Sequence, residues 1–288
     1  MKEGINIKEG IKMKRFGQAL ITACLLCTCL PATSYAQSVV AAVLPSSRSV
    51  QVGVPATAFA TIINVGPGTA TGCGIAPVTS LPATFAFQTT NPATNQITGT
   101  PNTPVDIPAG VAQSFVFAFT PTGAITPTDV QLSFDCTNTA PAPITSGLNT
   151  LLFSASTSPI PDIVALGATL NNDGIVNIPG PSGTGVFAVA TVNVGAGGAI
   201  TVSADTGTAT LPVSVAVCET NPATGACLTP VGSSVTTQIV GNATPTFGIF
   251  VMWTGLVPFD PAANRIFVRF KDADGVTRGS TSVAVRTQ

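Results

Sequence analysis

Histidine is absent from this 288-residue chain, and charged residues of both signs together make up only 8% of it. Its one tyrosine lies within the first 36 residues, and beyond them Lys271 is the only lysine and Glu219 the only glutamate. General acid–base and nucleophilic catalysis draw mainly on these residue types. The sequence therefore predicts a protein that is not an enzyme and that uses no catalytic residue and no cofactor.

The first 36 residues have the layout of a secretory signal peptide. Lys14 and Arg15 precede an apolar run over residues 19–30, and Ser34-Tyr35-Ala36 places small residues at the −3 and −1 positions of a cleavage site. The run is shorter than the about 20 residues that a membrane-spanning helix needs. We therefore predict export and cleavage before Gln37.

Two alternatives concern the same segment. Residues 1–12 are an unusual polar preamble, so Met13 is the more ordinary start of the signal peptide. The tetrapeptide Ile-Thr-Ala-Cys24 also resembles the lipobox of bacterial lipoproteins, which would leave Cys24 as an acylated N-terminus.

The composition of the remaining chain is that of a folded protein with a small negative charge. Glycine and proline together are 52 of 288 residues, or 18%, below the roughly 25–30% that marks disorder. Without residues 1–36 the chain has ten acids (12 − 2) and six bases (11 − 5), a formal net charge of −4. This charge argues against nucleic acid or an anionic membrane as partner. No segment beyond residue 36 is apolar for long enough to span a membrane.

An internal repeat indicates that one unit occurs twice. The pentapeptide Thr-Asn-Pro-Ala-Thr stands at residues 90–94 and again at residues 220–224. The Asn-x-Gly segment at residues 60–68 likewise returns, one residue shorter, at residues 190–197. Self-similarity at a fixed spacing is the sequence signature of repeated structural units.

Short runs rich in β-branched and aromatic residues alternate with clusters of Gly, Pro, Asn and Thr, and no sustained helical period occurs. About seven such runs per unit are typical of an immunoglobulin-like sandwich. We therefore predict an all-β protein with two tandem immunoglobulin-like antiparallel β-sandwich domains, residues 37–153 and 162–288. The proline-containing residues 154–161 are the predicted linker.

The cysteines beyond residue 36 number four and could pair in three ways. The first unit has no cysteine at the positions that match Cys218 and Cys227, and the second has none at the positions that match Cys73 and Cys136. The two cysteines of one unit are therefore either both present or both absent. This favours the disulfides Cys73–Cys136 and Cys218–Cys227. A zinc site is disfavoured, because this part of the chain has no Cys-x-x-Cys and no histidine.

Five of the six bases beyond residue 36 lie between Arg265 and Arg286. In the alternating run at residues 265–271, Arg265, Phe267, Arg269 and Lys271 share one face, which we interpret as a solvated outer sheet face. The alternative is an interaction surface for an acidic partner or a polysaccharide. Its candidates are Arg265, Arg269, Lys271 and the only tryptophan, Trp253, which is otherwise expected to pack in a core.

Calcium is a weaker possibility. Asp272-Ala-Asp274-Gly275 and Asn171-Asn-Asp-Gly174 resemble fragments of calcium loops, but both lack the spaced carboxylates and terminal Glu of an EF-hand. Asp-Gly is also ordinary turn chemistry. We therefore predict no metal site and keep Asp272 and Asp274 only as weak candidates.

Two segments resemble a known class of protein. The stretch over residues 60–70 resembles the Asn-x-Gly strand-turn of bacterial extracellular immunoglobulin-like repeats of the CARDB and DUF11 type. Residues 264–285 are similar to the endings of uncharacterised secreted proteins from Gram-negative bacteria. The resemblance implies a sandwich fold and a surface or envelope setting, and it carries over no functional residues.

These features predict an exported, non-enzymatic structural, adhesive or interaction module of the bacterial cell envelope or surface. It would be periplasmic, surface-bound or secreted, and its partner would be an envelope or surface protein or a polysaccharide. One alternative is an extracellular module that binds carbohydrate or calcium through loops near Cys218–Cys227 and Asp272–Asp274. The other is a pilus-type subunit that is completed by strand exchange.

Overall fold

The computed structural model describes residues 39–180 and 182–288. The predicted signal peptide, its cleavage before Gln37, the start at Met13 and the alternative acylation of Cys24 therefore lie outside the described residues. Within them the chain forms 18 strands and no helix, which confirms the predicted all-β class. No helix that could span a bilayer is found among the residues that the structure describes.

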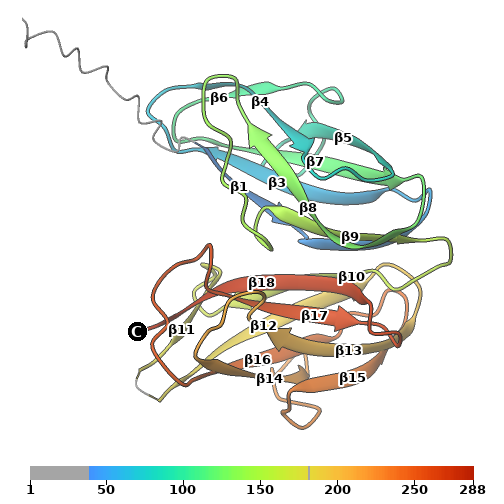
Figure 1. The fold of residues 1–288 in the computed structure, drawn as a ribbon, viewed down its shortest axis with the longest axis vertical. Helices are drawn as coiled ribbons and strands as arrows, with labels where there is room; N and C mark the ends of the chain where they lie inside the picture. Colours follow the sequence, from blue (N-terminus) through green and yellow to red (C-terminus); the bar gives the residue numbers. More distant parts are fainter. Residues whose placement is uncertain (1–38, 181) are drawn as a thin grey trace, which may run out of the picture. The chain divides into compact units, whose positions relative to one another are not determined.

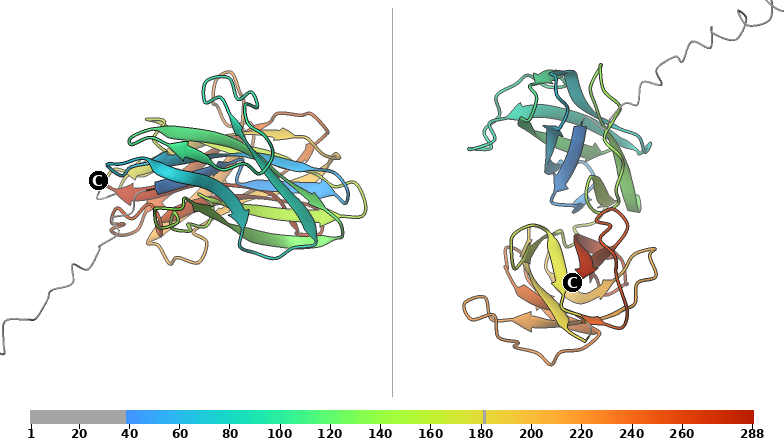
Figure 2. Two further views of the ribbon diagram at one scale, coloured as in Figure 1. Left: turned by 90° about the horizontal axis from the view of Figure 1, so that it is seen from above. Right: turned by 90° about the vertical axis from the view of Figure 1, so that its left-hand side faces the viewer.

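The first nine strands form two sheets that pack face to face (Figures 1 and 2). The four-stranded sheet has the order β1-β3-β7-β5, and the five-stranded sheet has the order β2-β9-β8-β4-β6. These strands are β1 (Val39–Leu44), β2 (Ser47–Gln51), β3 (Ala56–Asn64), β4 (Ala70–Pro77), β5 (Ala83–Thr90), β6 (Val105–Ile107), β7 (Ala112–Pro121), β8 (Ile125–Asp135) and β9 (Thr150–Ser156).

The last nine strands repeat this arrangement. Their sheets have the orders β10-β12-β16-β14 and β11-β18-β17-β13-β15, so each strand takes the place of the one nine positions earlier. These strands are β10 (Ile163–Thr169), β11 (Ile175–Ile178), β12 (Thr184–Asn193), β13 (Gly198–Asp205), β14 (Val213–Thr220), β15 (Ser234–Ile239), β16 (Thr246–Trp253), β17 (Arg265–Lys271) and β18 (Thr277–Thr287). The common strand order is what a sequence repeat predicts.

Two details differ from the sequence expectation. The sheets are not purely antiparallel, because β2 pairs parallel with β9 and β11 pairs parallel with β18. The predicted linker also begins too early, since Ser154, Ala155 and Ser156 belong to β9 and pair with β2. Pairing with β2 therefore makes residues 154–156 part of a strand, although their small polar side chains suggest a loop.

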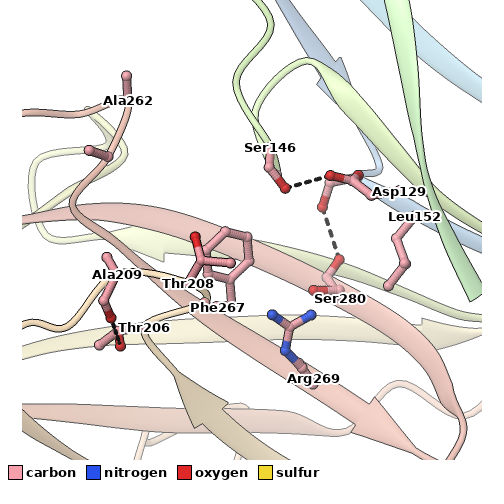
Figure 3. Close-up of a pocket in the computed structure, with 14 residues that line it drawn as sticks. Asp129, Ser146, Leu152, Thr206, Thr208, Ala209, Ala262, Phe267, Arg269 and Ser280 are labelled. Atoms are coloured by element: carbon pink, nitrogen blue, oxygen red, sulfur yellow. Dashed lines mark hydrogen bonds between the residues drawn. The ribbon is translucent and has the colours of Figure 1, made fainter. Parts of the chain in front are cut away.

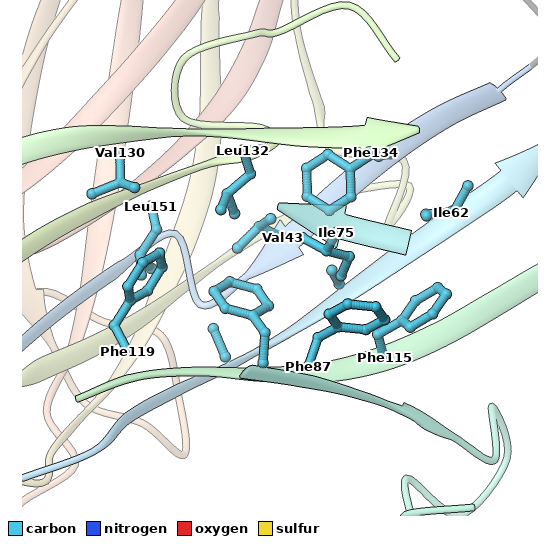
Figure 4. Packing of buried hydrophobic residues seen from close by; sticks show 14 of the residues in the cluster. Val43, Ile62, Ile75, Phe87, Phe115, Phe119, Val130, Leu132, Phe134 and Leu151 are labelled. Carbon is cyan, nitrogen blue, oxygen red and sulfur yellow. The ribbon is translucent and has the colours of Figure 1, made fainter. Parts of the chain in front are cut away.

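Period-2 alternation builds the core of the first sandwich. Phe115, Phe117 and Phe119 of β7 point inward and are at most 2% exposed, whereas the intervening Val116 and Ala118 face outward. Figure 4 shows Phe115 and Phe119 among the buried side chains. Burying a side chain of this size contributes about 1.5–3 kcal/mol. The core of the second sandwich is built mainly from valine and isoleucine, with Phe187, Phe247 and Phe270.

The repeated sequence motifs turn out to shape loops. The Asn64 side chain is buried, donates to the carbonyl oxygens of Gly68 and Ile107 and accepts from the Gly66 amide. Asn193 makes the equivalent bonds to Ala196, Ile239 and Gly195. A buried amide that satisfies three backbone groups explains why the Asn-x-Gly segment occurs in both units.

Candidate functional site

The two sandwiches meet through the edge of β2 on one side and β10 and β18 on the other. Ser47 and Ser280 exchange two hydrogen bonds, since Ser47 Oγ donates to the Ser280 carbonyl at 3.0 Å and the Ser280 amide donates to Ser47 Oγ at 2.6 Å. Ser46 Oγ also donates to the Ser280 carbonyl, at 2.9 Å. All three serines are buried, so these hydrogen bonds are largely shielded from water.

A buried ion pair lies at the same contact. Arg48 of β2 and Asp162, which directly precedes β10, have side chains that are only 12% and 4% exposed. Arg48 Nη2 lies 2.9 Å and Nε 3.0 Å from Asp162 Oδ2, while the Ser49 amide donates to Oδ1 at 2.9 Å. Burial raises the pKa of Asp162 above its ordinary 3.8, although the charge and hydrogen bonds of Arg48 and the Ser49 amide act in the opposite direction.

Arg265 does not lie on an open surface, which corrects its interpretation as part of an exposed basic face. The residue is 5% exposed, and its guanidinium donates to Pro261 O at 2.8 Å and to the hydroxyl and carbonyl oxygens of Ser282. Ser282 Oγ in turn donates to the Gly147 carbonyl of the first sandwich at 2.8 Å. Desolvation lowers the pKa of Arg265 to about 10. Arg265 therefore supports the contact between the sandwiches.

Beside this contact lies a cavity of about 480 Å³ that both sandwiches line (Figure 3). One wall is formed by the first sandwich, through Asp129 of β8 and through residues of the β8–β9 loop and of β9. The second sandwich contributes β17, β18, the β13–β14 loop and the β16–β17 loop. The lining residues are Ser46, Asp129, Ser146, Gly147, Leu152, Thr206, Gly207, Thr208, Ala209, Ala262, Ala263, Phe267, Arg269 and Ser280.

The charged side chains of the cavity are held in place. Arg269 donates to Asp205 through Nε at 2.6 Å and Nη2 at 3.2 Å, and its guanidinium lies 5.1 Å from the centre of the Phe267 ring. On the other wall Ser146 Oγ donates to Asp129 Oδ2 at 2.5 Å. The cavity thus combines a fixed cation, an exposed carboxylate, hydroxyl groups and one aromatic ring.

Two glycines bring the loops against the Phe267 ring. Gly147 and Gly207 have φ angles of +73° and +63°, which L side chains rarely adopt. A Cβ at Gly147 would lie 2.5 Å from Phe267 Cε1, and one at Gly207 would lie 2.7 Å from Phe267 Cε2. The ring is therefore lodged between a loop of each sandwich.

We expect Gly147→Ala to destabilise the protein more than Gly110→Ala does. Gly110 has a similar φ of +71° but no atom within 4 Å of a built Cβ, so its substitution costs only the backbone term of about 1–2 kcal/mol. At Gly147 the clash with Phe267 adds about 1–3 kcal/mol. Urea unfolding of both variants measures the difference, and equal losses would contradict the close packing of this loop on Phe267.

The remaining sequence candidates do not gather at one place. Lys271 is half-buried at the end of β17, and Trp253 ends β16 in the other sheet, where it packs against the second core. Trp253 therefore does not join the arginines in one interaction surface. Alternation along the sequence places Phe267 and Arg269 on one face of a strand. It gives no sign of Asp129, Ser146 and Thr208, because no local pattern links these distant segments.

Asp272 and Asp274 lie in the turn between β17 and β18. Asp272 Oδ1 accepts from the amides of Asp274 and Val276, and its Oδ2 accepts from Arg278 Nε at 2.6 Å. Both oxygens of Asp272 are therefore already engaged by the turn. Within residues 39–180 and 182–288, no group of three or more His, Cys, Asp or Glu side chains is placed to hold a metal ion.

The structure contains the disulfides Cys73–Cys136 and Cys218–Cys227. The first joins the middle of β4 to the residue after β8, and the second joins β14 to the loop that follows it. They are the pairs that the repeat argument favours. Disulfides form and persist in oxidising compartments, so the chain has the features of a periplasmic or extracellular protein.

No protein-family model matches the chain, and no curated protein sequence matches it. Solved structures with a similar arrangement include the secreted serine protease VesC from Vibrio cholerae, which is 11% identical with a TM-score of 0.24. The chain aligns over 72% of its own length but spans only 45% of that protease.

Two further similar structures are a protein of unknown function from Porphyromonas gingivalis W83 and the CupB6 tip adhesin from Pseudomonas aeruginosa. The first is 11% identical, with a TM-score of 0.27 and coverage of 86% of this chain and 99% of that one. The second is 8% identical, with a TM-score of 0.23 and coverage of 82% and 91%. At TM-scores this low, function is argued from the chain's own residues alone.

Proposed function

We propose that this protein is an exported, non-enzymatic interaction module of the bacterial cell envelope or surface, in which the two sandwiches act as one body. The observation that carries the proposal is the buried contact around Arg48–Asp162 and Ser47–Ser280. A chain that only needed two independent domains would gain nothing from burying an ion pair at their junction. A fixed junction instead sets the spacing of surfaces that meet a partner.

Three further features support this proposal. The two disulfides fit a periplasmic, surface or secreted location, as does the signal-peptide layout of residues 1–36. The resemblance of residues 60–70 to CARDB and DUF11 repeats points to the same setting. The absence of histidine from the sequence favours binding over catalysis.

The test combines processing with binding. We expect the protein recovered from its producing bacterium to begin at Gln37 and to gain four hydrogens on reduction. Purified residues 37–288 should co-sediment saturably with envelopes or envelope polysaccharide of that bacterium, without turnover in a broad hydrolase screen. An unprocessed cytoplasmic chain, non-saturable binding, or turnover of any substrate would contradict the proposal.

A pilus-type subunit remains an alternative that size-exclusion chromatography separates from this proposal. The outer edges of β5 and β14 are covered by the loops that follow them, since Thr98 donates to Thr89 O at 3.0 Å and Leu228 to Glu219 O at 2.7 Å. Covered edges disfavour strand exchange at these two positions. We therefore expect a monomer, and polymers that persist in the purified protein would favour the pilus-type alternative.

A second candidate function is carbohydrate binding. It is favoured by one observation, the cavity that brings Asp129, Phe267 and Arg269 together with several hydroxyl groups. The notion of a calcium-dependent module receives less support, because Asp272 is engaged by Arg278 and by its own turn.

A further inference from the structure

We propose that the cavity between the sandwiches binds a neutral sugar residue of a glycan. This inference deepens the carbohydrate-binding candidate above and rests on it. The cavity volume of about 480 Å³ lies within the range of about 300–1,000 Å³ that is usual for small-molecule sites. It therefore has room for one or two sugar rings.

The polar groups of the cavity suit hydroxyl groups that both donate and accept. Within the described part of the chain, Asp129 Oδ1 and Arg269 Nη1 have no hydrogen-bond partner in the protein, although the neighbouring atoms Asp129 Oδ2 and Arg269 Nε are engaged. Thr208 is exposed at the same cavity, and its hydroxyl is likewise unpartnered there. A carboxylate, a guanidinium and a hydroxyl provide acceptors and donors for adjacent sugar hydroxyls.

The apolar part of the cavity suits the C–H faces of a sugar ring. Leu152 and the alanines at positions 209, 262 and 263 line it together with Phe267, one face of which the Arg269 guanidinium covers. Figure 3 shows Phe267 on one wall of the cavity and Asp129 and Ser146 on the opposite wall. Small-molecule sites commonly combine such apolar walls with a few fixed polar groups.

The charge of the cavity selects among sugars. Asp205 neutralises Arg269 through two hydrogen bonds. The Asp129 carboxylate is then not compensated, and the cavity has one net negative charge. Like charges close together repel, and this disfavours uronic acids, sialic acids and phosphosugars. The structure therefore favours a neutral sugar.

The groups are preorganised by the fold. Ser146 orients the Asp129 carboxylate, Asp205 fixes the Arg269 guanidinium, and Gly147 and Gly207 close on the edges of Phe267. Because these residues belong to both sandwiches, a bound sugar would contact both of them. Such a ligand stabilises the joined state by mass action.

The experiment measures binding of methyl glycosides of glucose, galactose, mannose and N-acetylglucosamine to residues 37–288 by saturation-transfer NMR and calorimetry. We expect at least one to bind, and Asp129→Asn and Thr208→Val each to weaken it about 10-fold, the loss of one good hydrogen bond. Asp274→Asn removes the same charge from an exposed turn and should leave binding unchanged. Glucuronate should bind at least about 10-fold more weakly than glucose.

Asp129 and Thr208 are both exposed, so their variants should keep the wild-type melting temperature. Failure of all four glycosides to bind, or binding that Asp129→Asn and Thr208→Val leave unchanged, would overturn the sugar site. Saturable binding to envelope polysaccharide with an unaffected Asp129→Asn variant would refute the cavity and leave the interaction module standing. Absence of both kinds of binding would refute both proposals.

Discussion

Replacing Cys73 and Cys136 together by alanine is expected to lower the free energy of unfolding by about 4 kcal/mol, because the unfolded chain regains the entropy of a long loop. The two cysteines are 63 residues apart and are 0% and 4% exposed. Alanine is the appropriate replacement, since a hydroxyl at either position would be buried. Urea unfolding of the oxidised wild type and of the double variant measures the loss.

The second disulfide provides the control. Cys218 and Cys227 are only 9 residues apart, so the same relation gives about 2.6 kcal/mol for their replacement by alanine. Within this relation, loop length sets the difference between the two losses. Equal losses, or a larger loss for the short loop, would show that contacts in the folded state outweigh the entropy of the unfolded chain.

Arg48→Met is expected to destabilise the protein by about 3–5 kcal/mol at pH 7, because it leaves Asp162 charged, buried and without its counterion. Methionine fills a similar space, so the loss is chiefly electrostatic. The loss cannot exceed the free energy that holds the sandwiches together, since separation returns Asp162 to water. Urea unfolding gives the stability, and small-angle scattering detects the separation.

The loss is expected to shrink as the pH falls. Asp162 already has a raised pKa in the folded protein, and removal of the Arg48 charge raises it further. Between the ordinary value of 3.8 and this raised pKa, the folded state binds a proton that the unfolded state does not bind. Stability therefore increases as the pH falls through that window, and decreases as the pH rises through it.

Adding Asp162→Asn to Arg48→Met should recover most of the loss at pH 7, because asparagine is neutral and can still accept from the Ser49 amide. A loss that is independent of pH, or that persists in the double variant, would mean that Arg48 stabilises the contact through packing and its bond to Thr57 rather than through its charge.

Much of the fold was predictable from local pattern. Alternation in segments such as residues 115–119 indicates strands with one buried face, and the absence of a helical period excludes helices. The repeated Asn-x-Gly segment predicts equivalent turns, and the buried amides of Asn64 and Asn193 show why. The repeat also favours the disulfide pairs that the structure contains. These features depend on neighbours along the chain or on comparison of the two units.

The contact and the cavity were decided by tertiary structure. Alternation assigns Arg265 to the outer face of its sheet, but it cannot tell whether water or a second sandwich covers that face; the structure buries it. Ser47 and Ser280 are 233 residues apart, and Asp129 and Phe267 line one cavity although they belong to different sandwiches. A periodic pattern indicates which side of a strand is apolar. It contains no information about which polar residue, distant in the sequence, will contact that strand.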